Sequence, residues 1–134
     1  MAGAQPAAIV LVVEDDRDIQ ETMIDVLEDE GFRVAAAGNG REALDYLARA
    51  AEPPKLILLD LMMPLMDGFQ FREEQRRHPE WADIPVVVLT AHLQIRDLAQ
   101  SLQADDYIRK PLQLDSLFGV VRRYCLGATT GAPR

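Results

Sequence analysis

The chain has 134 residues, of which 49% are hydrophobic and 27% charged, so it holds enough apolar material for one compact domain and too little for two. Its formal net charge of −8 argues against a broad basic face that binds nucleic acid nonspecifically. The single cysteine, Cys125, excludes an intramolecular disulfide and favours a reducing cytoplasm. No apolar run approaches the ~20 residues that cross a bilayer, and residues 1–8 lack the basic start of a signal peptide.

Three short apolar runs predict strands that are buried on both faces, the pattern typical of a parallel sheet. They are Ile9–Val13, Leu56–Leu59 and Val86–Leu89. Arg33–Ala36 and Tyr107–Arg109 are the other strand candidates. The sequence therefore predicts five strands.

Apolar residues at helical spacing fill the intervals between these strands. The first helix contains the apolar positions of Ile19–Leu27, and Gly31 follows where a left-handed residue would end it. The segment Phe69–Arg77 is polar after Phe71, so a helix is predicted there mainly because parallel strands need a crossover connection. The other helices are predicted within Ala43–Ala48, Arg96–Gln103 and Leu114–Cys125.

Five strands that alternate with five helices predict an α/β fold, a doubly wound parallel sheet with helices on both faces. The Gly-, Pro- and Ala-rich ends, residues 1–7 and 127–134, are predicted to be loose termini of one domain over residues 8–126. Ligands of such sheets bind outside the carboxyl ends of the strands, where the strand order reverses. Residues at those ends are therefore the candidates for a functional site.

Charged and polar residues follow four of the predicted strands. Glu14, Asp15 and Asp16 come after the first strand, Asp60 and Thr90 end two others, and Lys110 follows the last. Carboxylates gathered at one edge repel one another unless a cation offsets their charge. Oxygen ligands of this kind suit Mg²⁺.

Each of these residues also has a simpler interpretation. The acidic run could only cap a helix, with Asp16 or Asp18 as the capping residue, and Lys110 alone could be a surface lysine. Asp60 fits such an interpretation poorly, because a carboxylate at the end of an apolar run is badly solvated without a partner. The joint placement of these residues at the strand ends favours a site.

Four segments carry a resemblance to a known family. Together they resemble the receiver domain of bacterial two-component response regulators, over nearly the whole chain. They are VLVVEDD (10–16), LILLDLMMPLMDG (56–68), VVVLTA (86–91) and DDYIRKP (105–111). The resemblance implies a flavodoxin-like sheet with the strand order 2-1-3-4-5.

The resemblance implies a role for each matching residue. Asp60 would be the carboxylate that accepts a phosphoryl group. Asp15 would bind Mg²⁺ directly, Glu14 would hold it through water, and the backbone carbonyl of Met62 would complete the metal site together with Asp60.

The remaining roles concern the phosphoryl group and the conformational switch. Thr90, the backbone N–H of Ala91 and Lys110 would bind phosphoryl oxygens. The peptide bond between Lys110 and Pro111 is expected to be cis. Tyr107 would be the aromatic residue that turns inward when Thr90 moves towards the phosphate.

Two further positions would set the lifetime of the phosphorylated state. Met62 and His92 lie two residues beyond Asp60 and Thr90, where they would flank the path of the hydrolysing water. Met62 offers no hydrogen bond, whereas His92 could orient the water or, when protonated, pair with phosphoryl oxygens.

Some positions depart from the family pattern without touching the phosphorylation chemistry. Gln103 stands where many receivers have glycine, so a left-handed residue there would carry a strain of roughly 1 kcal/mol. Arg72 and Gln75 stand where apolar residues are frequent, and the segment between Thr90 and Lys110 is short. These departures concern the surface that meets partners.

We therefore expect a stand-alone receiver of the single-domain type, a phosphorylation-activated signalling switch in the cytoplasm. Its partners would be a sensor histidine kinase or a histidine phosphotransfer protein, and a downstream protein reached by contact or phosphorelay, without nucleic acid or membrane insertion. Phosphorylation-dependent dimerisation is one form that this output could take. The chain would catalyse its own aspartyl phosphorylation and dephosphorylation, although signalling is its main role.

Other interpretations stay open at this point. The chain could be a receiver-like binding module that works without phosphorylation, or a receiver excised from a hybrid kinase. A phosphatase with an aspartate nucleophile would need a second acid two residues after Asp60, where Met62 stands.

Overall fold

The structure is a computed structural model that describes residues 8–61 and 66–126. The predicted loose termini, residues 1–7 and 127–134, and the predicted site residue Met62 lie outside these ranges. The strands are β1 (Ile9–Val13), β2 (Arg33–Ala37), β3 (Leu56–Asp60), β4 (Val86–Thr90) and β5 (Asp106–Arg109). The helices are α1 (Arg17–Asp29), α2 (Gly40–Arg49), α3 (Gly68–Arg77), α4 (Pro79–Ala82), α5 (Ile95–Leu102) and α6 (Leu114–Cys125).

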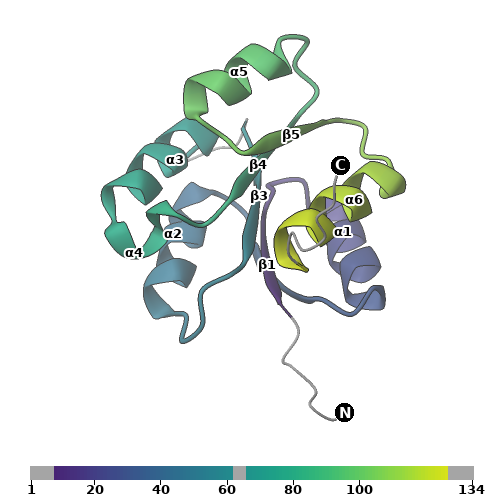
Figure 1. Cartoon of the computed structure of the whole chain (residues 1–134), viewed down its shortest axis with the longest axis horizontal. Helices are drawn as coiled ribbons and strands as arrows, with labels where there is room; N and C mark the ends of the chain where they lie inside the picture. The colour runs from purple at the N-terminus through teal and green to yellow at the C-terminus, as the bar shows by residue number, and fades with distance from the viewer. Residues whose placement is uncertain (1–7, 62–65, 127–134) are drawn as a thin grey trace.

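The five strands form one parallel sheet in the order β2-β1-β3-β4-β5, which confirms the predicted fold. Helices α1 and α6 cover one face of this sheet, and α2, α3, α4 and α5 lie on the other side (Figure 1). The strand order reverses at β1 and β3. The carboxyl ends of these two strands therefore border the crevice in which such sheets bind ligands.

The core explains why the central strands are continuous apolar runs. Every residue of β3 and β4 is buried, as are Val10–Val13 of β1, because helices cover both faces of the sheet. Alternate residues serve opposite faces: Val10 and Val12 pack with α1 and α6, whereas Leu11 and Val13 pack with α2 and α3.

The described residues contain six helices rather than the predicted five. The additional helix, α4, is a single turn in which the N–H groups of Trp81 and Ala82 donate to the His78 carbonyl. Pro79 stands at its start, where the fixed φ of proline favours a helical turn. Four residues are too few to show helical periodicity, so the sequence pattern does not predict this turn.

Local signals at the ends of α1 and α5 agree with the sequence. The Asp16 side chain accepts a hydrogen bond from the Ile19 N–H at 3.1 Å and so caps α1, and Gly31 follows the helix with a φ of 96°. Gln103 ends α5 in the left-handed conformation, with a φ of 56°. The expected departure at Gln103 is therefore present in the backbone.

Helix α3 contains a buried polar group that its sequence did not reveal. Arg72 donates to the carbonyls of Leu102 and Gln103, at 2.9 and 2.6 Å, and to Gln75 Oε1 at 2.8 Å. Gln75 in turn donates to the Trp81 carbonyl at 2.9 Å. We call Arg72, Gln75 and these bonds the α3 network. It ties α3 to the C-terminal end of α5, including the left-handed Gln103.

Candidate functional site

The carboxyl edge of the sheet brings together most of the residues that the sequence predicts for a site. The pairing of Val13 with Leu59, and of Asp60 with Leu89, sets the ends of β1, β3 and β4 side by side. One cleft at this edge is lined by seven of the predicted residues. They are Glu14, Asp15, Asp60, Thr90, Ala91, His92 and Lys110.

Three carboxylates form the centre of this cleft. Oxygens of Glu14, Asp15 and Asp60 all lie within 4.8 Å of one another, and we call these residues the acidic cluster. Glu14 and Asp60 are only 1% and 4% exposed, whereas Asp15 is exposed. Negative charges this close repel strongly in a partly desolvated site, so the cluster requires a neighbouring positive charge.

Lys110 supplies part of that charge from the residue after β5. Its Nζ lies 2.8 Å from Glu14 Oε1 and 3.6 Å from Asp60 Oδ1. Among the described residues, Glu14 Oε1 accepts no other hydrogen bond. The peptide bond between Lys110 and Pro111 is cis, as expected. One ammonium faces three carboxylates, which leaves net negative charge in the cleft.

The pKa values reflect this imbalance. Burial, and next the negative charge of Glu14, raise the pKa of Asp60 to about 7, although Lys110 acts in the opposite direction. Burial lowers the pKa of Lys110, but its contacts with Glu14 and Asp60 outweigh burial and raise it overall. Two buried carboxylates and one exposed carboxylate with excess negative charge form a donor set that fits a hard divalent cation such as Mg²⁺.

The backbone after Asp60 is packed closely against the start of α3. Gly68 donates its N–H to the Leu61 carbonyl at 3.1 Å. A Cβ at Gly68 would lie only 2.8 Å from the Asp60 carbonyl oxygen, so glycine permits this approach. The contact holds the end of β3, and with it Asp60, in place at the cleft.

The loop after β4 forms the opposite wall of the cleft. Thr90 is 4% exposed, and its Oγ1 accepts a hydrogen bond from the His92 N–H at 3.2 Å. The Nδ1 atom of His92 accepts the N–H of Gln94 at 3.0 Å. This bond requires an unprotonated Nδ1, so the ring is held in one orientation beside the cleft.

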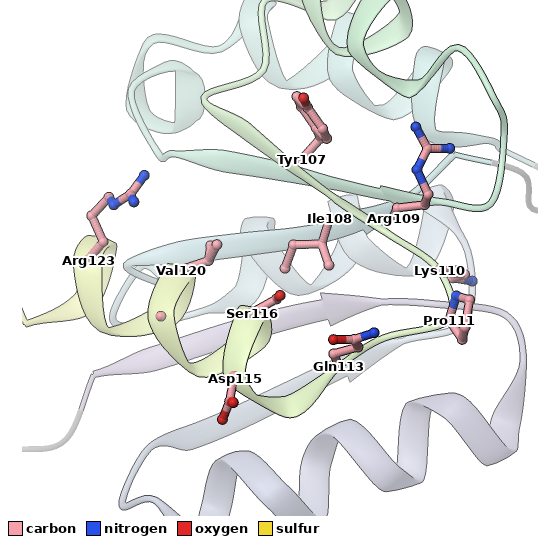
Figure 2. Close-up of a pocket in the computed structure, with 11 residues that line it drawn as sticks. Tyr107, Ile108, Arg109, Lys110, Pro111, Gln113, Asp115, Ser116, Val120 and Arg123 are labelled. Carbon is pink, nitrogen blue, oxygen red and sulfur yellow. The ribbon is translucent and has the colours of Figure 1, made fainter.

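Tyr107 lies on β5, outside the cleft and at the border of the groove between β5 and α6. Figure 2 shows its side chain directed to the opposite side of β5 from Ile108. The ring is half-buried and packs against a buried cluster that includes Leu102 of α5. The phenol also interacts with Arg96, whose pKa it raises. Tyr107 therefore contacts α5, the helix that follows the Thr90 loop.

Sequence reasoning missed Arg109, which neighbours the cleft through this loop. Its Nη1 donates to the His92 carbonyl at 2.8 Å, and its Nη2 lies 3.5 Å from the Leu93 carbonyl. The alternation of β5 places Arg109 on the same face as Tyr107 (Figure 2). No sequence pattern predicts which carbonyls such a side chain reaches.

Comparison with known families matches residues 10–122 to the response regulator receiver domain. The chain belongs to this family. The receiver domain is the phosphorylation-dependent signalling domain of two-component systems, and its acidic cluster is compatible with Mg²⁺ and with phosphorylation of an aspartate. The cleft described above contains this acidic cluster.

Individual relatives agree with this assignment. An uncharacterized 14.6 kDa protein of Leptolyngbya boryana is 40% identical over 119 residues, which cover 87% of this chain and 89% of that protein. The response regulator Rre1 of Synechocystis is 38% identical over 89% of this chain, but the match covers only 52% of Rre1. The receiver domain thus spans about half the length of that relative.

A solved structure shows the same fold. The response regulator protein TrrA of Thermotoga maritima, in complex with Mg²⁺-BeF, has a TM-score of 0.76 and 31% identity, and the match covers 87% of this chain and 98% of TrrA. Within the part of the chain that the structure describes, no helix has both the length and the apolar character needed to span a membrane.

Proposed function

We propose that Asp60 accepts a phosphoryl group from a phosphohistidine, and that this receiver thereby switches between two signalling states. A carboxylate oxygen of Asp60 attacks the phosphorus as the P–N bond breaks, and the imidazole nitrogen keeps the electron pair and takes a proton. A later attack of water on the acyl phosphate returns the carboxylate and inorganic phosphate. The single observation that carries this proposal is the acidic cluster with Lys110 across it.

The residues of the cleft divide the work of charge neutralisation. Glu14, Asp15, Asp60 and the carbonyl of Met62 would hold Mg²⁺, which supplies positive charge next to the transferring group. Lys110 is placed to pair with a phosphoryl oxygen on Asp60, because its ammonium already lies 3.6 Å from the Asp60 carboxylate. The complex of TrrA with Mg²⁺-BeF supports this assignment by analogy.

The Thr90 loop would complete phosphoryl binding and transmit it. The Thr90 Oγ1 accepts a bond from His92, which leaves the hydroxyl hydrogen available to a phosphoryl oxygen, alongside the N–H of Ala91. Movement of Thr90 towards the phosphate would give Tyr107 room to turn inward from its half-buried position against α5. The surface around Tyr107 and α5 would then change for a partner.

The lifetime of the phosphoprotein would depend on Met62 and His92 at the entrance for water. The unprotonated Nδ1 of His92 accepts the Gln94 N–H, so Nε2 is the nitrogen that remains for water or for the phosphoryl group. We expect a long-lived phosphoprotein, because Met62 offers the water no hydrogen bond. Its donor would be a sensor histidine kinase or phosphotransfer protein, and its output a protein contact or an onward relay.

The proposal is tested by labelling the chain with acetyl phosphate in the presence of Mg²⁺. The wild type should acquire an acid-labile, hydroxylamine-sensitive label, and Asp60→Asn should acquire none, because the amide is not a nucleophile. Asp16→Asn is the matched control: asparagine also caps a helix, so labelling should persist. Labelling of Asp60→Asn at the wild-type level would refute Asp60 as the acceptor.

A further inference from the structure

The loop between β4 and α5 has few anchors of its own. It carries Ala91 and His92 along one wall of the cleft, but the Leu93 side chain is 87% exposed and does not pack. Gln94 begins α5 without a side-chain cap. Its internal bonds, from His92 to Thr90 and from Gln94 to His92, fix a turn without tying that turn to the rest of the domain.

Arg109 provides a tie from outside the loop. Its backbone pairs with Thr90 in the sheet, and the next residue, Lys110, donates its N–H to the Thr90 carbonyl at 3.0 Å. From this fixed position the guanidinium donates to the His92 carbonyl at 2.8 Å and approaches the Leu93 carbonyl at 3.5 Å. A rigid strand residue thus holds the two carbonyls that follow the phosphoryl-binding N–H of Ala91.

The guanidinium acts on the loop and not on the phosphoryl group itself. Arg109 lines the groove with Tyr107 and Ile108 (Figure 2), and it is not among the residues that line the cleft of Asp60. Its planar fork of donors suits two successive carbonyls, which a flexible ammonium matches less well. Any effect of Arg109 on phosphoryl binding is therefore indirect.

We propose that Arg109 is a positioning residue for phosphoryl binding: it holds the His92 and Leu93 carbonyls so that the N–H of Ala91 and the hydroxyl of Thr90 face Asp60 in advance. This inference rests on the proposed function. A loop held in advance loses less conformational freedom when the phosphoryl group binds. Without Arg109, that ordering must occur on binding, which weakens binding of the phosphoryl group without changing the carboxylates that hold the metal.

The test compares two affinities in the whole chain: that for Mg²⁺ alone and that for beryllofluoride in the presence of saturating Mg²⁺. Arg109→Gln should weaken beryllofluoride binding about fivefold, the effect of roughly one net hydrogen bond, and leave Mg²⁺ affinity unchanged. Arg109→Lys should recover part of the loss, because one ammonium still reaches the His92 carbonyl. Urea unfolding of each variant shows whether the fold itself has weakened.

Arg123→Gln is the matched control. Arg123 is an exposed arginine that lines the same groove, but it pairs with Asp106 and not with the carbonyls of the loop. It should bind beryllofluoride like the wild type. Equal beryllofluoride affinity of Arg109→Gln and wild type overturns the inference alone, as does a parallel loss of Mg²⁺ and beryllofluoride affinity, which indicates a purely structural role. A wild type that binds no beryllofluoride refutes the proposed function and this inference together.

Discussion

Two groups of polar side chains in this domain, each with buried members, differ in how far their members satisfy one another. In the α3 network, the Arg72 guanidinium has three acceptors between 2.6 and 2.9 Å, and the Gln75 amide bridges onward to the Trp81 carbonyl. In the acidic cluster, the Lys110 ammonium faces three carboxylates and contacts two of them, Glu14 and Asp60. A satisfied group stabilises the fold, whereas a group with excess charge is stabilised further by binding a cation.

The difference shows in how each group responds to its surroundings. The α3 network joins α3 to the end of α5 through hydrogen bonds from Arg72 to backbone carbonyls. Because these carbonyls already satisfy the guanidinium, the network needs no ligand. The pKa of Asp60, raised to about 7 by burial and by Glu14, shows that the acidic cluster takes up a proton near neutral pH when nothing else offsets its charge. The α3 network therefore stabilises the fold, whereas the acidic cluster responds to protons and cations.

The largest expected effect comes from breaking the α3 network. Arg72→Met should lower the free energy of unfolding by about 2–4 kcal/mol, because it leaves the Gln75 amide oxygen and two helix-end carbonyls without their donor. Urea denaturation measures this loss. Arg76→Met, at an exposed position of the same helix, is the control and should change stability little. An equal loss of unfolding free energy in both variants would mean that the hydrogen bonds of the α3 network do not stabilise the fold.

The next effect tests the excess charge of the acidic cluster through pH. The folded pKa of Asp60, about 7, exceeds that of an unfolded aspartate, so its contribution to stability is present at low pH and is lost as pH rises towards and through 7. Asp60→Asn removes this titration and should stabilise the protein at pH 8 without Mg²⁺ by about 2 kcal/mol. At pH 4 the two proteins should be nearly equal in stability. A variant less stable than wild type at pH 8 would show that Asp60 is well compensated.

The affinity for Mg²⁺ should distinguish the roles of two adjacent carboxylates, Asp15 and Asp16. Asp15 belongs to the acidic cluster and Asp16 caps α1, so Asp15→Asn should weaken Mg²⁺ binding about tenfold, or about 1.4 kcal/mol. Asp16→Asn should have a much smaller effect, because its carboxylate lies outside the cluster and asparagine keeps the cap. Equal losses of Mg²⁺ affinity in both variants would contradict the assignment of Asp15 to the metal and of Asp16 to the helix cap.

The smallest expected effect is at Trp81, which reports on the α3 network. Trp81 lies before the amino end of β4, stacks near His78 with ring centroids 4.3 Å apart, and accepts the Gln75 bond. Because a satisfied network has no reason to rearrange when the cleft is filled, tryptophan fluorescence should change little on addition of beryllofluoride and Mg²⁺. A large change in intensity would instead reveal coupling between the two groups.

The sequence predicted the acidic cluster but not the α3 network, and the reason is physical. Parallel strands end at one edge of a sheet, so Asp15 and Asp60 were placed together by topology alone, before any side chain was seen. Arg72 and Gln75 lie on a helix whose polar composition is typical of a solvated face. Their burial depends on which carbonyls α4 and α5 present, and periodicity contains no information about that.

The same limit explains the details that the structure added around the cleft. The apolar runs of β3 and β4 predicted strands because both faces of a parallel sheet are covered. The single turn of α4 was missed because four residues make barely more than one helical turn, which is too short for apolar residues to recur at helical spacing. The bonds from Arg109 to the His92 loop were missed because loop conformation, and not residue type, decides which groups meet.

The most direct test of the central claim, that the group with excess charge is the phosphorylation site, is to locate the phosphoryl group by chemistry. After incubation with acetyl phosphate and Mg²⁺, borohydride reduction converts a phosphoaspartate to homoserine, which peptide mass spectrometry assigns to a position. We predict a single modified residue per chain, at Asp60. Modification of a different residue, or of none under conditions in which Mg²⁺ is bound, would contradict the account.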